Sequence, residues 1–425
     1  MKNYKKVYAA FILAGGLILH GCNGIFDDLA INPNQPSMGA YFTSPSAVND
    51  AVMTMYGYMS TQRCLGASGS KTTIIRSDEA SSNSDYGKPG MFGADLNASY
   101  YTIEQPYTLM YTTASQASYI IETAPSVDFS GNEELRNAYM GEAYFWRAFA
   151  HYYLLINFRN ISPIRQMPRN GDDYVRPLEK PAAVWNFIQE DLAHAKELLP
   201  VKGYWDSKNA GRVTKASAAA LLGKAYLYRS GIEQYYGEDK TTFYSEAAKE
   251  FGDVIDGKYG TYDLTKNYAV AHENNEESIL EFQFLGDVDN AGFNPGLATS
   301  GLAFDSRGLM LPGAGVGYEG VVHNWLYNAF VNSVDKDGYT DIRMFSTMIF
   351  NDLDASIHLR NDAGGNPVRL EGPGGYKWEE LYPAKNGKEG FATVSNPLAH
   401  SFKAGIRKGI DCSMPTQTEA DGTPK

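Results

Sequence analysis

The sequence predicts a mostly α-helical protein, in which pairs of helices form a scaffold and a large, irregular, loop-rich region with few short strands follows. Apolar side chains recur at three- and four-residue steps through several segments of the first 255 residues, which is the spacing of one buried helix face. Beyond that point glycine, asparagine and aspartate become frequent, and these residues favour turns and loops. The expected helices cover residues 46–60, 103–123, 133–157, 182–199, 215–230 and 243–255.

Individual residues fix the faces and ends of these helices. In the segment 133–157, seven side chains from Leu135 to Ile156 recur at helical spacing, so we expect this face to be buried. Pro181 suits the first turn of the next helix, because a proline there gives up only an amide that has no partner. Pro200 ends that helix.

A motif shared by two of the helices indicates a repeat. Residues 222–226, Leu-Gly-Lys-Ala-Tyr, fit the first helix of a tetratricopeptide repeat, and Ala247 and Phe251 fit its second helix. Residues 140–144 are a weaker copy of the first-helix motif. Residues at the spacing expected for its second helix follow at Ile188, Leu192, Ala195 and Pro200. The scaffold is therefore expected to be tetratricopeptide-like.

The small residue of each motif predicts close helix packing. Gly141 and Gly223 leave room for a neighbouring helix, and the tyrosine three residues later fills the space beside it. The two glycines lie much farther apart than the repeat period of about 34 residues. Long loops are therefore expected to interrupt each pair.

An export signal precedes the expected scaffold. Three lysines come before an apolar run from Val7 to Leu19, which would span about 20 Å as a helix, against roughly 30 Å for a hydrocarbon core. The tetrad Leu-His-Gly-Cys at 19–22 resembles a bacterial lipobox, in which the cysteine is lipidated and becomes the mature N-terminus. We therefore expect Cys22 to carry a lipid anchor; an ordinary signal peptide with an incidental cysteine is the alternative.

Charge and cysteine content exclude several classes of protein. Removing the signal takes away three lysines and no acid, which lowers the formal net charge from −12 to −15. Nucleic-acid binding needs basic patches that neutralise phosphates, so we expect no nucleic-acid partner. Besides Cys22 the chain has only Cys64 and Cys412, which excludes a disulfide scaffold and leaves either one bridge or two free thiols.

The sequence contains no recognisable catalytic or metal-binding motif. The seven histidines lack the spacing of a metal site, and neither a Gly-x-Ser-x-Gly elbow nor a phosphate-binding glycine loop is present. Residues 335–341, DKDGYTD, resemble a calcium loop only in part, because the glycine comes too early and no glutamate closes the loop, so they are expected to form a turn. Carboxylate pairs for glycoside hydrolysis are defined by their separation in space, which the sequence does not give.

Several stretches occur in the order found in one known family. The long stretches are GEAYFWRAFAHYYLLINFRNISPI (141–164), AVWNFIQEDLAHAKELLP (183–200) and GRVTKASAAALLGKAYLY (211–228). Two shorter stretches, NNEESILEFQF (274–284) and DIRMFSTM (341–348), look like the Glu-Ser-Ile strand and the Asp-x-Arg segment of that family. Together they resemble the SusD/RagB outer-membrane lipoproteins over nearly the whole mature chain.

This resemblance implies a function in nutrient uptake without catalysis or a cofactor. It implies a lipoprotein anchored in the outer membrane and facing the cell exterior, which binds a glycan and delivers it to a SusC-like TonB-dependent barrel. Peptide or glycopeptide cargo, as in RagB, is the first alternative. A surface glycosidase is the second, and the resemblance argues against it.

The resemblance also divides the chain and nominates ligand residues. It implies a signal peptide (1–21), a lipid-anchored tether (22–40), a helical scaffold with inserted loops (41–256) and a loop-rich ligand face (257–425). Aromatic rings in Gly/Asn/Asp-rich stretches can stack on sugars or pack under loops. The candidates for ligand contact are Tyr86, Phe92, Phe293, Tyr318 and Trp325.

Three residues of the long stretches, Glu142, Trp146 and Arg147, are instead expected to pack and to form buried pairs.

One departure from the family concerns the end of the chain. Members usually continue into another helical pair, whereas this sequence stops at the polar TQTEADGTPK. A helical array needs a last pair to cover the apolar face before it. The sequence is therefore expected to be a fragment lacking the C-terminal helical pair, with a shortened member as the alternative.

Overall fold

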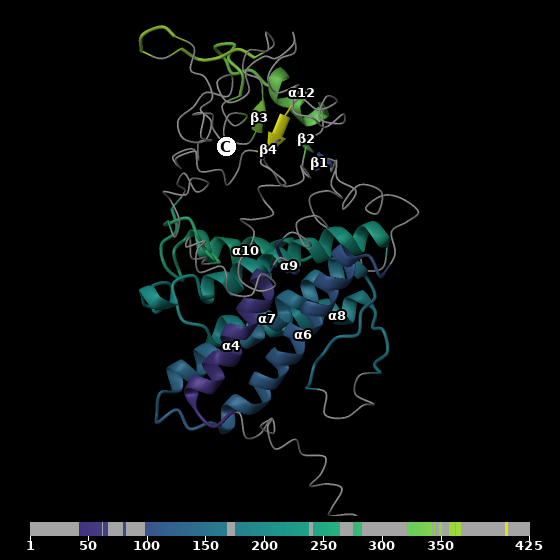
Figure 1. Cartoon of the computed structure of the whole chain (residues 1–425), viewed down its shortest axis with the longest axis vertical. Helices are drawn as coiled ribbons and strands as arrows, with labels where there is room; N and C mark the ends of the chain where they lie inside the picture. The colour runs from purple at the N-terminus through teal and green to yellow at the C-terminus, as the bar shows by residue number, and fades with distance from the viewer. Residues whose placement is uncertain are drawn as a thin grey trace, which may run out of the picture.

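The computed structural model describes residues 42–61, 63–66, 80–81, 98–167, 175–237, 241–263, 275–282, 321–322, 324–341, 344, 348–350, 357–361, 363–366 and 404–406. Within these ranges the protein consists of a block of long helices and a small sheet with one short helix (Figure 1). The helices of the block are α4 (Pro45–Ser60), α6 (Tyr101–Thr123), α7 (Glu133–Phe158), α8 (Pro181–Leu198), α9 (Lys215–Tyr236) and α10 (Tyr244–Ile255). The mostly helical fold predicted from the sequence is confirmed, and each of the six expected helices is present.

The helices pack as a sequential array. α7 packs against α6 and α8, and α9 packs against α8 and α10, so each helix contacts its neighbours along the chain. Short 3-10 turns, η1 (Ala124–Ser126) and η3 (Ser207–Asn209), lie in two of the connections. Such stacking of antiparallel pairs is the arrangement of a tetratricopeptide-like scaffold.

The two motif glycines sit where neighbours approach closely, as predicted. A Cβ atom on Gly141 would lie 2.8 Å from Cγ of Leu199, and one on Gly223 would lie 2.8 Å from the ring of Phe251. Since Phe251 belongs to the expected second helix of the same repeat, this contact confirms the α9–α10 pairing. The tyrosine of the motif, Tyr226, stacks on Phe243 at 5.6 Å between ring centroids.

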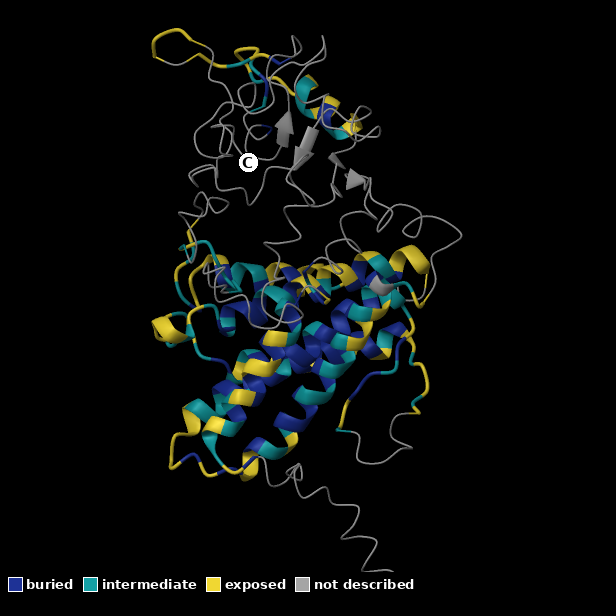
Figure 2. Ribbon diagram, viewed as in Figure 1, coloured by how far each residue is buried: buried dark blue, intermediate teal, exposed yellow. Residues whose placement is uncertain are grey.

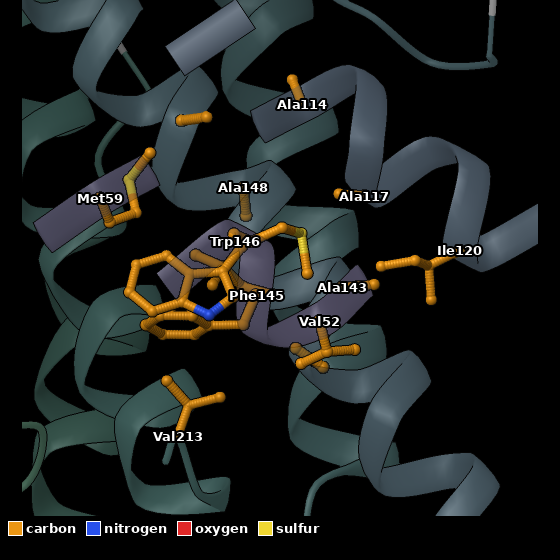
Figure 3. Close-up of a cluster of buried hydrophobic side chains, with 14 of the residues drawn as sticks. Val52, Met59, Ala114, Ala117, Ile120, Ala143, Phe145, Trp146, Ala148 and Val213 are labelled. Atoms are coloured by element: carbon orange, nitrogen blue, oxygen red, sulfur yellow. The ribbon is translucent and has the colours of Figure 1, made fainter. Parts of the chain in front are cut away.

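The core runs through the middle of the helical block, where buried residues concentrate (Figure 2). Its centre is the fully buried indole of Trp146, around which side chains of α4, α6 and α7 gather (Figure 3). The side chains labelled around it are Val52, Met59, Ala114, Ala117, Ile120, Ala143, Phe145, Ala148 and Val213. Among the described helices, none is both long enough and apolar enough to cross a membrane.

A four-stranded antiparallel sheet joins distant parts of the chain. Its strands are β1 (Ala80–Ser81), β2 (Val321–Val322), β3 (Met348–Phe350) and β4 (Ala404–Ile406), in the order β1-β2-β4-β3. The sheet lies beyond α9 and α10 in Figure 1, together with the short helix α12 (Asn324–Asn332). No sequence pattern indicated α12, which interrupts the region expected to be loop-rich.

Two local predictions need correction. The helix expected at 215–230 continues to Tyr236, because the carboxylate of Glu233 is buried and accepts hydrogen bonds from Arg159 and Trp185, which hold the last turns against α7 and α8. The expected Glu-Ser-Ile strand is not a strand within residues 275–282. There the side chain of Asn275 accepts hydrogen bonds from the backbone of Glu277 and Ser278, which folds the segment into a turn instead.

Candidate functional site

The candidate ligand residues are only partly within the described structure. Trp325 lies on α12, whereas Tyr86, Phe92, Phe293 and Tyr318 lie outside the described residues. Cys22, the expected lipidation site, also lies outside them. The roles of these residues therefore stay predictions.

Trp325 presents an aromatic surface to solvent. It is the second residue of α12, and its side chain is 50% exposed. Two residues later, Tyr327 is only 1% exposed and anchors the same helix. A half-exposed indole on an anchored helix offers an apolar aromatic face, on which a sugar ring can stack.

The pairing of β1 and β2 relates two of the sequence segments that carry candidate aromatics. Ser81 pairs with Val321 and Ala80 with Val322, antiparallel. The segment with Tyr86 follows Ser81, and the segment with Tyr318 precedes Val321. Because opposed residues of an antiparallel pair are adjacent, the two segments attach at the same end of β1 and β2.

The acidic stretch 335–341 forms a turn, as predicted. Oδ1 of Asp335 accepts hydrogen bonds from the backbone N–H of Asp337 at 2.9 Å and of Tyr339 at 3.0 Å. Gly338 adopts φ +84°, a conformation that glycine allows without strain. Arg360 pairs with the carboxylate of Asp335. In the described part of the chain no three His, Cys, Asp or Glu side chains are grouped so as to hold a metal ion.

Glu142 is the centre of a buried polar network that ties three parts of the scaffold together. Its carboxylate accepts hydrogen bonds from Arg212 at 2.6 Å and from the hydroxyl of Tyr56 at 2.6 Å. The Tyr56 hydroxyl also accepts the backbone N–H of Val213 at 2.8 Å. Burial raises the pKa of Glu142, and the charge of Arg212 opposes this shift. The predicted role of Glu142 in buried pairing is confirmed.

Arg147 holds α7 to α8 in the same way. Its guanidinium forms a two-pronged ion pair with Asp191, at 2.7 and 2.8 Å, and also donates to the hydroxyl of Ser118 and the carbonyl of Arg165. One turn further on, His151 accepts a backbone N–H on Nε2 and lies 2.8 Å from the Arg147 carbonyl through Nδ1. Burial lowers the pKa of His151 to about 3, so the ring is neutral and structural.

Cys64 is a buried free thiol, whereas Cys412 lies outside the described residues. Burial raises the pKa of Cys64 to about 12. A thiol with so high a pKa is un-ionised at neutral pH and therefore unreactive.

An open cavity of about 760 Å³ lies between the scaffold and residues 277–280. α7, α9 and the end of α10 line it with Phe149, Leu221 and Val254, among other apolar side chains. Aromatic and charged side chains line it as well, among them Phe145, Tyr262, Lys224 and Glu277.

Comparisons with known proteins show which proteins this chain is similar to. A family model described as "Starch-binding associating with outer membrane" matches residues 30–227. The SusD-like protein P2 of Formosa agariphila is 25% identical over 300 residues, which cover 69% of this chain and 55% of that protein. The chain spans about half the length of the curated relatives it matches.

Solved structures share the fold. A SusD-like carbohydrate-binding protein from Bacteroides fragilis has a TM-score of 0.59 at 18% identity, covering 90% of this chain and 70% of that one. A laminarin-binding SusD-like protein has a TM-score of 0.56 at 23% identity, covering 72% of this chain and 67% of that one.

Proposed function

The chain belongs to the SusD/RagB family, and we propose on this basis that it binds an oligosaccharide of neutral sugars without cleaving it. The observation that carries the proposal is Trp325, a half-exposed indole on a helix that Tyr327 anchors beside the small sheet. The names of two solved relatives, one carbohydrate-binding and one laminarin-binding, support a glycan as the ligand. The net charge of −12 favours neutral cargo over polyanions.

Affinity electrophoresis tests this function through Trp325. The native chain is expected to be retarded in gels that contain a neutral polysaccharide, beginning with laminarin, and to release no sugar from it. Trp325→Ala is expected to weaken retention about fivefold in Kd, because an aromatic ring contributes on the order of 1 kcal/mol by stacking.

Tyr235→Ala is the matched control, since Tyr235 is 84% exposed but lies on the scaffold helix α9. Equal losses of retention in the two variants would show that Trp325 is not part of the binding site. Release of sugar by the purified protein would contradict non-catalytic binding and indicate a glycosidase. Retention by no polysaccharide, with binding to peptides, would favour the RagB-like alternative.

We further propose that Cys22 anchors the chain in the outer membrane, facing the exterior, and that the ligand passes to a SusC-like TonB-dependent barrel. Purification of the tagged chain from detergent-solubilised membranes of its own cells tests both parts. A lipidated N-terminal cysteine by mass spectrometry and a co-purifying barrel are expected. Cys22→Ser should abolish lipidation, whereas Cys64→Ser should not; an unmodified Cys22 in the native chain would contradict the anchor.

A further inference from the structure

Residues 275–282 lie across the scaffold just before the sequence that carries Phe293 and Tyr318. This segment is neither helix nor strand, so no ladder of backbone hydrogen bonds holds it. Instead, side chains from separate parts of the scaffold contact it at its start, middle and end. We call residues 275–282 the crossing segment.

Lys202 holds the start of the crossing segment. Its Nζ donates to the backbone carbonyl of Glu276 at 3.1 Å and to that of Thr261 at 2.9 Å, and lies 4.1 Å from the ring centroid of Tyr262. One ammonium group therefore joins the crossing segment to the chain that leaves α10. Both acceptors are carbonyls, so this link is independent of the side chains at 261 and 276.

The backbone around Lys202 is shaped for this contact. The amide of Lys202 donates to the carbonyl of Tyr259 at 3.1 Å. Next to it, Gly260 adopts φ +115°, and a Cβ atom there would lie 2.5 Å from Cβ of Lys202. Only glycine allows the turn at 257–260 to approach this closely, and the approach brings the Thr261 carbonyl within reach of Nζ.

Ser217 and Phe282 hold the middle and the end. The hydroxyl of Ser217, in the first turn of α9, donates to the carbonyl of Ile279 at 2.9 Å. The ring of Phe282 lies 5.8 Å from the Trp146 indole and 6.5 Å from the Tyr56 ring, between centroids. Since Tyr56 also bonds Glu142, the segment ends directly on the buried polar network.

From these contacts we infer that Lys202 is a positioning residue for ligand binding: with Ser217 and Phe282 it fixes the point on the scaffold from which the chain enters the loop-rich region. This inference rests on the proposed glycan binding. A segment fixed in the free protein loses less conformational freedom on binding than one that must be ordered by the ligand. Lys202 itself needs no contact with the glycan.

Lys202→Met tests the inference, because methionine keeps much of the aliphatic stem and removes the donors. A glutamate-specific protease reports directly on the crossing segment, which contains Glu276, Glu277 and Glu281. Cleavage at these sites requires local opening, so its rate follows the population of the opened segment. The rate is expected to rise about tenfold, as mass spectrometry of the fragments would measure, because two hydrogen bonds are lost. Retention by the polysaccharide is expected to weaken.

Two variants make the test specific. Lys208→Met, at an exposed lysine on η3, should leave both cleavage and retention unchanged. Lys202→Arg, which keeps the charge and the donors, should restore much of both. The thermal midpoint followed by helical circular dichroism should stay constant, which separates positioning from general destabilisation.

Cleavage in Lys202→Met at the native rate would overturn the inference whether or not a glycan binds. If Lys202→Met is cleaved faster but is retained by the polysaccharide as strongly as the native chain, Lys202 holds the crossing segment but does not position it for ligand binding. If the native chain binds no polysaccharide, the proposed function fails, and the cleavage rates alone decide whether Lys202 holds the segment.

Discussion

Replacing Glu142 by glutamine is expected to lower the free energy of unfolding by about 3–5 kcal/mol, as denaturant titration followed by circular dichroism would measure. The substitution keeps the shape of the side chain but leaves the guanidinium of Arg212 buried without its counter-charge. Glu142 and Arg212 have side chains only 0% and 3% exposed, so water does not compensate for the loss. Their attraction acts in a medium of low polarity, where an unpaired charge is costly.

An exposed ion pair on the same helix provides the control. Arg136 pairs with Glu133 in the first turn of α7, where the two side chains are 28% and 59% exposed. Arg136→Gln is therefore expected to change the free energy of unfolding by no more than about 1 kcal/mol. The double variant Glu142→Gln/Arg212→Met should lose less than the sum of its single changes. Equal small effects at both pairs would mean that Glu142 is solvated.

The second large effect concerns two helical glycines with opposite outcomes. Gly141→Ala is expected to destabilise the protein by about 1–3 kcal/mol, because the new methyl group would overlap Cγ of Leu199 at 2.8 Å and crowd its backbone nitrogen at 3.0 Å. Gly57→Ala is expected to stabilise it by about 0.5–1 kcal/mol. A Cβ atom on Gly57 meets nothing within 4 Å, so only the gain in helix propensity remains.

Thermal unfolding of the two variants beside the native chain measures both changes. Since the substitution is chemically identical, the difference in sign isolates the contact with Leu199 from the helix propensity of alanine. A stabilised Gly141→Ala variant would show that α7 and the end of α8 separate easily, which contradicts the close packing of the first repeat.

The helical scaffold was predictable because the sequence patterns that specify each helix lie within that helix. Periodic apolar residues located all six helices, and the motif glycines identified their partners, since a missing side chain marks a close approach. Glu142 and Arg147 could be assigned to packing because they belong to a stretch that resembles a landmark helix of the family. Their partners were not predictable, because Arg212 and Asp191 lie on other elements.

Contacts between distant residues account for what the sequence did not reveal. The last turns of α9 are polar and contain Gly231, which suggests an early end, yet Arg159 and Trp185 bind Glu233 from other helices. Strands as short as β1 and β2 carry no periodicity of their own and exist only through their pairing. No sequence motif marks the contacts of Lys202, because its ammonium group binds backbone carbonyls, which every residue supplies.

The pairing of Ser81 with Val321 has a consequence for the order in which the chain can be completed. Along the chain, five of the six scaffold helices, all except α4, lie between these two residues, and β4 follows only at Ala404. These helices find their partners among near neighbours as synthesis proceeds. The sheet has no second strand until residue 322 has emerged and no fourth until 406, so the sheet forms only after the described helices of the scaffold.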